Sequence, residues 1–585
     1  MKDLVALFRN TFSRIPGKDR HKIFLLTATT SLIALLDLVG VVLLAGVGTL
    51  GFRLVAPNEK PTRIEILVHQ ISGLNLNLTQ LALIMGSFAI LFLTAKTIAQ
   101  AALSYKSTNF LSRIETEMSI QLYEKIIKSP VASAEAHSIS AYQYALIVGP
   151  NRFIVGYVGA FISLVSDSFS IILMGSFALY ASPVSFLLSV LVFGITYAFI
   201  NGPIHAKATM FGEQNARIYA KMVTQMSEDF SGIREVKIYN QENLVISKFL
   251  TLRRDFAKLN QRMFWINNIV RYFLEIAVLA IGVLVLVILA ITTDMRHAVT
   301  VLVAFIAIGF RLLPNIQRIQ NAFNSVRIAE GTTKDLFLFS DELDFATKYE
   351  VNRNKLIEFN EIQGKNVLFS YPDAPDQPIF GPIDFQIPAM ATTMIFGASG
   401  SGKSTLLDLI CKFNEPTSGS VDYLSRDGKR MKELPELGFV SQKSSLFGED
   451  LLANIAFAKS GQILDMDRAN SVISTLNLGN LSSGVNRKDI RSDGTNISGG
   501  ERQRIAMARV MYVSPEVVIL DEPTSSLDSM NRQSIHDFLV RMRSSKTIVL
   551  VSHDIELIDY CDYVINLDDG KIAFQGKASD FKSQM

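Results

Sequence analysis

Apolar residues are concentrated in six long runs in the first part of the chain. The runs cover residues 23–50, 78–102, 154–180, 184–200, 269–292 and 298–314. A helix needs about 20 predominantly apolar residues to cross the hydrocarbon core of a bilayer. The pattern therefore predicts six membrane-spanning helices, and an even number of crossings places both ends of the chain on one side.

Basic residues identify that side as the cytoplasm. Lys and Arg accumulate in residues 2–22, before the first run, and in residues 207–258, between the fourth and fifth runs. Such an excess is typical of cytoplasmic loops. The long polar segments 103–150 and 201–265 then predict helices that extend inward past the membrane, although ordinary solvated loops often have the same composition.

Several ionisable residues fall inside the apparent spans, where a charge is costly and often functional. Asp37 and Asp167 lie deepest and are, together with Arg311, candidates for the lining of a polar translocation cavity. Hydrogen bonds between spans are the structural alternative for the two acids. Lys96, Arg271 and Arg311 are near enough to span ends for their charged heads to snorkel to the interface.

Composition agrees with a chain that lies partly in lipid. Of its 585 residues, 49% are hydrophobic and only 19% are charged. The ratio of hydrophobic to charged residues is higher than is usual in a soluble protein. A formal net charge of +3 is too small to indicate a nucleic-acid partner. The two cysteines, Cys411 and Cys561, are too few for a disulfide framework and have no metal-ligand spacing, so we expect structural roles for both.

A phosphate-binding loop follows in the second half of the chain. Alternating apolar and polar residues predict strands over 357–369 and 383–396, and the second strand runs directly into a glycine-rich loop and a helical pattern. Strand, Gly-x-x-x-x-Gly-Lys-Ser loop and helix in this order are typical of a P-loop, where backbone amides and the helix N-terminus attract phosphate. Lys403 is expected to reach the β- and γ-phosphates and Ser404 to bind Mg²⁺. The predicted ATP-binding residues of this loop are Gly397, Ala398, Ser399, Gly400, Ser401, Gly402, Lys403, Ser404 and Thr405.

A second apolar strand, residues 517–520, ends in two carboxylates, Asp521 and Glu522. At the carboxyl edge of a sheet beside the P-loop, Asp521 is expected to support Mg²⁺ through water, and Glu522 to orient and deprotonate the attacking water. Alone, this sequence would indicate a buried strand followed by an acidic turn. The P-loop upstream favours the catalytic interpretation.

Residues 496–504, Asn-Ile-Ser-Gly-Gly-Glu-Arg-Gln-Arg, resemble the signature motif of ABC transporters. In that family the motif contacts the γ-phosphate of nucleotide held by the opposite subunit, and a helix start with serine and glycines is a suitable anion cradle. The resemblance implies that Ser498, Gly499, Gly500 and the dimer-crossing Asp528 contact ATP of a partner subunit. Three further single residues also match: Tyr371 for the aromatic stacked on adenine, Gln442 for a ligand of Mg²⁺, and His553 for the catalytic switch at the γ-phosphate.

The chain also departs from the family pattern. Glu501 stands where Gln is commoner, Ile497 where Leu is commoner, and Pro523 where exporters often have Ala. None of these changes removes a phosphate-binding group. Segment 489–494 lacks the Gly-Glu pair common in exporters, so this segment gives less support for a contact with the intracellular loops.

The resemblance implies the fold of an ABC exporter. An all-α domain of six spans, residues 1–330, would be connected by a linker, 331–356, to an α/β P-loop ATP-binding cassette, 357–585. Residues 226–238 resemble the second intracellular loop, which in the family reaches the nucleotide-binding domain of the partner subunit. One P-loop and one signature motif per chain imply a half-transporter that uses ATP and Mg²⁺ for alternating access. Because its hydrolytic residues are complete we expect a homodimer, with a heterodimer as the alternative.

Residues 310–318, with Asp37 and the amphipathic piece after the first span, resemble bacterial flippases of lipid-linked oligosaccharides. This implies an amphipathic substrate, a lipid-linked oligosaccharide or glycolipid, in the bacterial inner membrane, with membrane lipid as a further partner. Exporters of other lipids, drugs or peptides are the alternative within the class. A soluble ABC ATPase, which would have two cassettes and no spans, is disfavoured by the six apolar runs.

Overall fold

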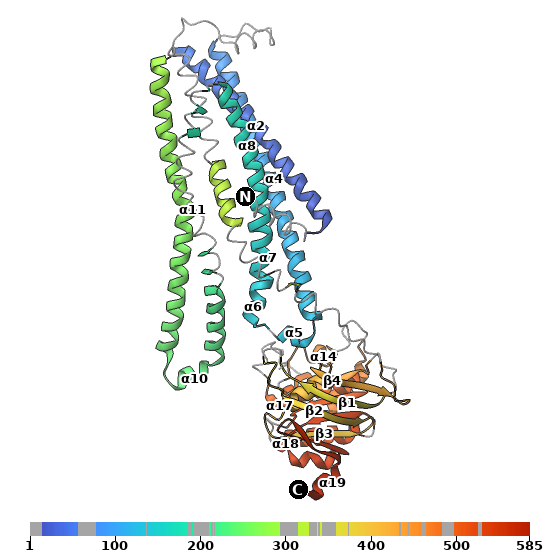
Figure 1. Cartoon of the computed structure of the whole chain (residues 1–585). Coiled ribbons are helices and arrows are strands. Elements are labelled where there is room, and N and C mark those ends of the chain that lie inside the picture. Colours follow the sequence, from blue (N-terminus) through green and yellow to red (C-terminus); the bar gives the residue numbers. More distant parts are fainter. Residues whose placement is uncertain are drawn as a thin grey trace. The chain divides into compact units, whose positions relative to one another are not determined.

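The structure is a computed structural model of the whole chain (Figure 1). It describes residues 15–55, 78–135, 137–181, 217–292, 314–326 and 359–584, and a few isolated positions between these ranges. The last range has gaps at 372–373, 432–433, 443, 448–449, 458–463, 483–496, 525–528 and 544. The chain divides into two compact units, residues 1–129 with 134–346 and residues 130–133 with 347–585, which are treated separately below.

The described part of the first unit contains four long helices: α2 (Gly17–Val55), α4 (Leu78–Lys128), α8 (Gly159–Ala181) and α11 (Glu242–Thr292). The helices α4 and α11 have 51 residues each. At about 1.5 Å per residue both are far longer than the ~30 Å hydrocarbon core. Each continues from an apolar run into the polar segment beside it.

Three helices among the described residues are long and apolar enough to cross a membrane: Gly17–Gly40, Thr79–Lys128 and Ala141–Tyr180. They correspond to the first three predicted spans, and the fifth predicted span lies in α11. The predicted fourth span lies largely outside the described residues and the sixth almost entirely so. The number of crossings therefore stays a prediction.

A region of wide helical turns precedes α8. Short helices α5 (Val131–Glu135) and α6 (Ile139–Gln143) lead into two π-helical segments, η1 (Tyr144–Val148) and η2 (Arg152–Val158), which flank the single turn α7 (Gly149–Asn151). The N–H of Gly149 donates to the carbonyl of Tyr144, five residues earlier, as a π turn requires. Pro150, inside α7, has no N–H and interrupts the regular ladder.

Buried apolar side chains join these helices, and α2 packs against both α4 and α8 (Figure 1). Ile23, Leu111, Phe153 and Tyr157 are among the residues of this core. Many large apolar side chains on the outer faces are exposed instead, such as Phe24 at 72%. Exposed apolar surface on this scale is typical of a protein that meets lipid or another subunit. A further short helix, α10 (Ile233–Ile238), precedes α11.

The second unit contains two sheets and their covering helices (Figure 1). The six-stranded sheet has the order β5–β6–β7–β3–β8–β9, parallel except for its last pair, and the antiparallel three-stranded sheet has the order β2–β1–β4. The strands are β1 (Phe359–Phe369), β2 (Phe380–Pro388), β3 (Thr392–Gly397), β4 (Ser418–Ser425), β5 (Leu437–Val440), β6 (Val517–Asp521), β7 (Thr547–Val551), β8 (Tyr563–Asp568) and β9 (Lys571–Lys577). The helices are α13 (Lys403–Ile410), α14 (Leu451–Ile455), α15 (Met466–Thr475), α16 (Gly479–Ser482), α17 (Gly499–Val513), α18 (Ser529–Arg543), the 3₁₀ helix η4 (Ile555–Tyr560) and α19 (Ala578–Gln584).

Burial explains the sequences of the central strands of the six-stranded sheet. Every residue of β7 is buried, as are the first four of β6, and all of these buried residues are apolar or β-branched. The prediction of a single strand over 383–396 is wrong. The chain turns after β2, where Met390 adopts a left-handed backbone (φ 55°), and β3 joins the other sheet. Non-glycine residues rarely adopt this conformation, so the alternating pattern gave no sign of the turn.

Candidate functional site

The carboxyl ends of four neighbouring parallel strands bring the predicted catalytic residues to one edge of the six-stranded sheet. Strand β5 leads to Gln442, β6 to Asp521 and Glu522, β7 to His553, and β3 to the P-loop at Gly397. The pairs β5–β6, β6–β7 and β7–β3 are all parallel. Open α/β sheets bind ligands at this edge.

Glycine is required at two positions of the P-loop. Gly397 and Gly402 have φ of +155° and +94°, and a Cβ on Gly397 would lie 2.3 Å from the carbonyl oxygen of Leu567. A Cβ on Gly402 would lie 2.9 Å from Cδ1 of Phe380. The tight loop places the left-handed Gly402 at the N-cap of α13, and the first backbone amides of a helix have no partner within the helix.

Lys403 is buried at the start of α13, and its ammonium donates to the carbonyls of Gly397 at 3.0 Å and Ala398 at 2.7 Å. The loop thus holds the cation at its own centre, where phosphate oxygens are expected. Tyr371 lies beside the same helix, with its hydroxyl 3.2 Å from Oγ1 of Thr405 and 43% of the residue exposed. An exposed ring at this place is available for stacking.

Glu522 lies between two other predicted residues. Its Oε2 accepts a hydrogen bond from Nε2 of Gln442 at 3.3 Å, and its Oε1 lies 3.4 Å from Nδ1 of His553. The backbone of Glu522 is left-handed (φ 44°), and its N–H donates to the carbonyl of Val551 in β7 at 2.8 Å. A glutamate in this sparsely populated conformation is held by its surroundings, a situation common at active sites.

Asp521 has the properties of a metal-supporting carboxylate. Its Oδ1 is buried and has no hydrogen-bond partner within the described part of the chain. Burial raises the pKa of this carboxyl, the charge of Glu522 adds to the rise, and Lys403 opposes it. Among the described residues, no three His, Cys, Asp or Glu side chains could hold a metal by themselves. A cation here would need nucleotide phosphates and water as ligands, which is how Mg²⁺ is commonly bound.

The signature segment begins α17. Ser498 is the N-cap, and it forms a capping box with Glu501; Gly499 and Gly500 are the first residues of the helix. Further along, Nε2 of Gln503 donates to the carbonyl of Pro523, directly after Glu522. The signature helix and the catalytic loop of one chain are therefore linked. The predicted Asp528 lies outside the described residues.

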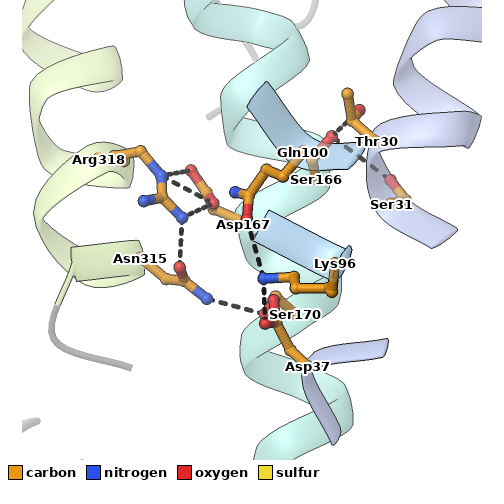
Figure 2. A network of polar contacts seen from close by, with 10 residues as sticks. All are labelled: Thr30, Ser31, Asp37, Lys96, Gln100, Ser166, Asp167, Ser170, Asn315 and Arg318. Atoms are coloured by element: carbon orange, nitrogen blue, oxygen red, sulfur yellow. Dashed lines mark hydrogen bonds and ion pairs between the residues drawn. The ribbon is translucent and has the colours of Figure 1, made fainter. Parts of the chain in front are cut away.

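In the first unit, polar contacts connect α2 to its neighbours (Figure 2). Lys96 of α4 forms an ion pair with Asp37 of α2, with side-chain exposures of only 1% and 10%. Nζ of Lys96 also donates to Oε1 of Gln100 at 2.8 Å. The hydroxyls of Thr30 and Ser166 are 2.6 Å apart and connect α2 to α8. The prediction that Lys96 snorkels to the interface is wrong, because a buried carboxylate holds its charge inside the helical unit.

Asp167 of α8 is also paired with a cation, Arg318, whose side chain is 47% exposed (Figure 2). Arg318, in the helix at residues 314–326, donates from Nε to both carboxylate oxygens at 3.1 Å and from Nη2 to Oδ1 at 2.8 Å. Asn315 contacts Arg318 and donates to the hydroxyl of Ser170 at 2.8 Å. These contacts favour the structural alternative for both acids, while a role in lining a cavity stays a prediction.

The candidate residues did not include Arg318 and Asn315. The signal was present, because the two polar residues follow Pro314 at helical spacing i, i+3 near the end of the sixth apolar run. Arg311, the remaining cavity candidate, lies outside the described residues.

Known proteins resemble this chain along most of its length. Residues 53–312 match the ABC transporter transmembrane region, and residues 380–525 match the ABC transporter family. The ATP-dependent lipid A-core flippase of Burkholderia pseudomallei (strain 1710b) is 24% identical over 503 residues, covering 84% of this chain and 83% of the relative. The flippase of the same name from Cupriavidus pinatubonensis (strain JMP 134 / LMG 1197) is 25% identical over 495 residues, covering 82% of each. A solved structure of a bacterial Atm1-family ABC exporter with ATP bound has a TM-score of 0.72 and 16% identity, and 96% of each chain is covered.

These matches confirm the predicted fold class, a helical membrane domain followed by an ATP-binding cassette with a mixed sheet. They also confirm ATP hydrolysis coupled to transport, and the half-transporter architecture implies dimerisation. A soluble ABC ATPase does not fit a chain with a transporter membrane region. The chain belongs to the ABC transporters and is an integral membrane half-transporter of the exporter type.

Proposed function

We propose that this protein flips a lipid-linked oligosaccharide or a related glycolipid across the bacterial inner membrane. The supporting observation is its similarity, over more than four fifths of its length, to relatives that are ATP-dependent lipid A-core flippases. The proposal includes six spans with both termini in the cytoplasm. It keeps Asp37, Asp167 and Arg311 as candidates for the cavity through which the substrate's polar part passes.

In the proposed ATP site, the P-loop amides and Lys403 bind the β- and γ-phosphates, and Tyr371 stacks on the adenine. Lys403 exchanges the carbonyls of Gly397 and Ala398 for phosphate oxygens, which are stronger acceptors because they are charged. The buried position of the ammonium makes this exchange favourable, since water screens it little.

Hydrolysis requires a base close to the γ-phosphate. Glu522 takes this role, because its carboxylate is held at 3.3 Å from Gln442 and 3.4 Å from His553 at the edge where the P-loop ends. It accepts a proton from the attacking water, while His553 contacts the γ-phosphate and keeps the carboxylate in place.

Mg²⁺ fits the same edge of the sheet. Ser404, Gln442 and Asp521 would hold it, the last through water, and the unpartnered Oδ1 of Asp521 supports this assignment. The bound ion would neutralise charge that develops on the transferred phosphoryl group.

We further infer that two copies of this chain form a homodimer with two shared ATP sites. Ser498, Gly499 and Gly500 of one subunit, with Asp528, would contact the nucleotide held by the P-loop of the other. The exposure of Ser498 and Gly499 at the start of a 15-residue helix supports this, because the helix N-terminus is available to an anion from outside the chain. Closure of the dimer around ATP would then drive alternating access.

Reconstitution into liposomes tests the substrate. ATP hydrolysis is measured with a lipid-linked oligosaccharide, a plain phospholipid or a peptide present, and any stimulating molecule is followed across the bilayer in a flipping assay. We expect stimulation and ATP-dependent movement with the lipid-linked oligosaccharide, and neither with the Glu522→Gln variant. Stimulation and movement of only the phospholipid or the peptide would refute the proposed substrate and leave the ATP site untouched.

A further inference from the structure

Ser498 and Glu501 form reciprocal hydrogen bonds at the start of α17. Oε2 of Glu501 accepts both the backbone N–H and the hydroxyl of Ser498, each at 2.8 Å. In return, the Ser498 hydroxyl oxygen accepts the N–H of Glu501 at 3.2 Å. The hydroxyl proton of Ser498 is therefore directed at a carboxylate of its own chain.

That proton is the one needed for the proposed contact across the dimer. A serine hydroxyl has a single proton and two lone pairs. An ionised phosphate oxygen can only accept a hydrogen bond, so Ser498 must donate its proton in order to bind it. Hydrogen bonds to charged acceptors are about twice as strong as neutral ones. The Glu501 carboxylate therefore competes with the phosphate for this proton.

We propose that Glu501 is a positioning residue that holds the Ser498 hydroxyl proton back and so weakens nucleotide-driven closure of the dimer. The inference rests on the proposed function of Ser498 and deepens it. Glu501 acts through the orientation of Ser498 and not by touching the nucleotide. The consequence is a transporter that needs a higher ATP concentration to close than a neutral residue at this position would require.

Helix capping alone is the competing explanation of Glu501. In a Ser-x-x-Glu capping box the two side chains satisfy each other's free amides, and Gln serves nearly as well as Glu. Glutamine therefore separates the two roles. Its Oε1 can accept the Ser498 N–H, while its Nε2 can donate to the hydroxyl oxygen and turn the hydroxyl proton outward.

The first test compares wild type, E501Q and D467N in reconstituted protein, with steady-state ATP hydrolysis and thermal unfolding as readouts. Asp467 is an exposed acid in the first turn of α15, so D467N removes the same charge from another helix start. We expect E501Q to lower KM for MgATP about five- to tenfold, the ratio for replacing a charged acceptor by a neutral one. Both kcat and Tm should stay close to wild type, and D467N should match wild type throughout. An E501Q KM equal to that of wild type would overturn the inference.

The second test asks whether Glu501 acts through the Ser498 hydroxyl. In the E522Q background, the ATP concentration that half-saturates dimer closure is measured by spin-label distances for four versions: no further change, E501Q, S498A and S498A/E501Q. We expect E501Q to lower this concentration only where the hydroxyl is present. An equal effect of E501Q in the S498A background would refute the mechanism. If S498A changes neither closure in this background nor ATP hydrolysis in the protein that keeps Glu522, the proposed role of Ser498 itself fails, whatever E501Q does.

Discussion

Replacing Asp37 by Asn would leave the ammonium of Lys96 buried beside a neutral amide. The Lys96 side chain is only 1% exposed, so water cannot replace the lost carboxylate. Removing one partner of a buried ion pair costs about 3–5 kcal/mol. The hydrogen bond from Lys96 to Gln100, 2.8 Å long, is present in both proteins and does not change this difference. We therefore expect D37N to lower the free energy of unfolding of the helical unit by about 3–5 kcal/mol.

Denaturant unfolding of protein in lipid nanodiscs measures this value. The double variant D37L/K96M, which removes both charges and fills the space with apolar atoms, should lie within about 1 kcal/mol of wild type. The control is E124Q, which breaks an exposed pair with Lys128 on the same helix and should cost under about 0.5 kcal/mol. A cost of D37N no larger than that of E124Q, or a double variant as unstable as the sum of its single variants, would show that the pair is not buried as described.

Other sites give predictions of their own. E522Q should lower steady-state phosphate release about 10²–10⁴-fold, because the general base is lost. Near-normal turnover would show that Glu522 is not the general base. D521N should raise the Mg²⁺ concentration for half-maximal hydrolysis about 10- to 100-fold; an unchanged Mg²⁺ titration would argue against Asp521 as a support of the ion. Gly402→Ala, at φ +94°, should cost at least about 1–2 kcal/mol in denaturant unfolding, whereas the same change at Gly479, where a Cβ meets nothing within 4 Å, should cost little. Burial raises the pKa of the Cys561 thiol to about 12. At pH 8 only about one thiol in ten thousand would be ionised, so maleimide labelling followed by mass spectrometry should find Cys561 inert until the protein unfolds.

Local chemistry made the ATP site predictable. The P-loop and the strand before Asp521 are each recognised from a short run of consecutive residues. Parallel pairing of the buried strands then brings these distant segments to one edge of the sheet. The structure accordingly places Gln442 and His553 against Glu522, although each of these matches is weak alone.

Contacts between distant segments were harder to predict from the sequence. Asp37 and Lys96 are 59 positions apart, and Asp167 and Arg318 are 151 apart, so no periodic pattern relates the partners. The sequence identifies an acid within a span but not whether a cation from another helix neutralises it. The turn at Met390 was missed for another reason, because methionine does not favour the left-handed backbone that it adopts there.

The wide turns before α8 also determine which way that helix faces. In an α-helix each residue advances the chain by about 100° and 1.5 Å, so one extra residue in a continuous α-helix rotates everything after it. A π-helical turn closes on the fifth residue back, as the Gly149 N–H does, and so takes up one residue more than an α-helical turn. The stretches η1 and η2 therefore set the register in which α8 presents Asp167 to Arg318. One residue inserted within α8 before Asp167, where no π turn takes it up, would point this carboxylate away from Arg318 without having changed it.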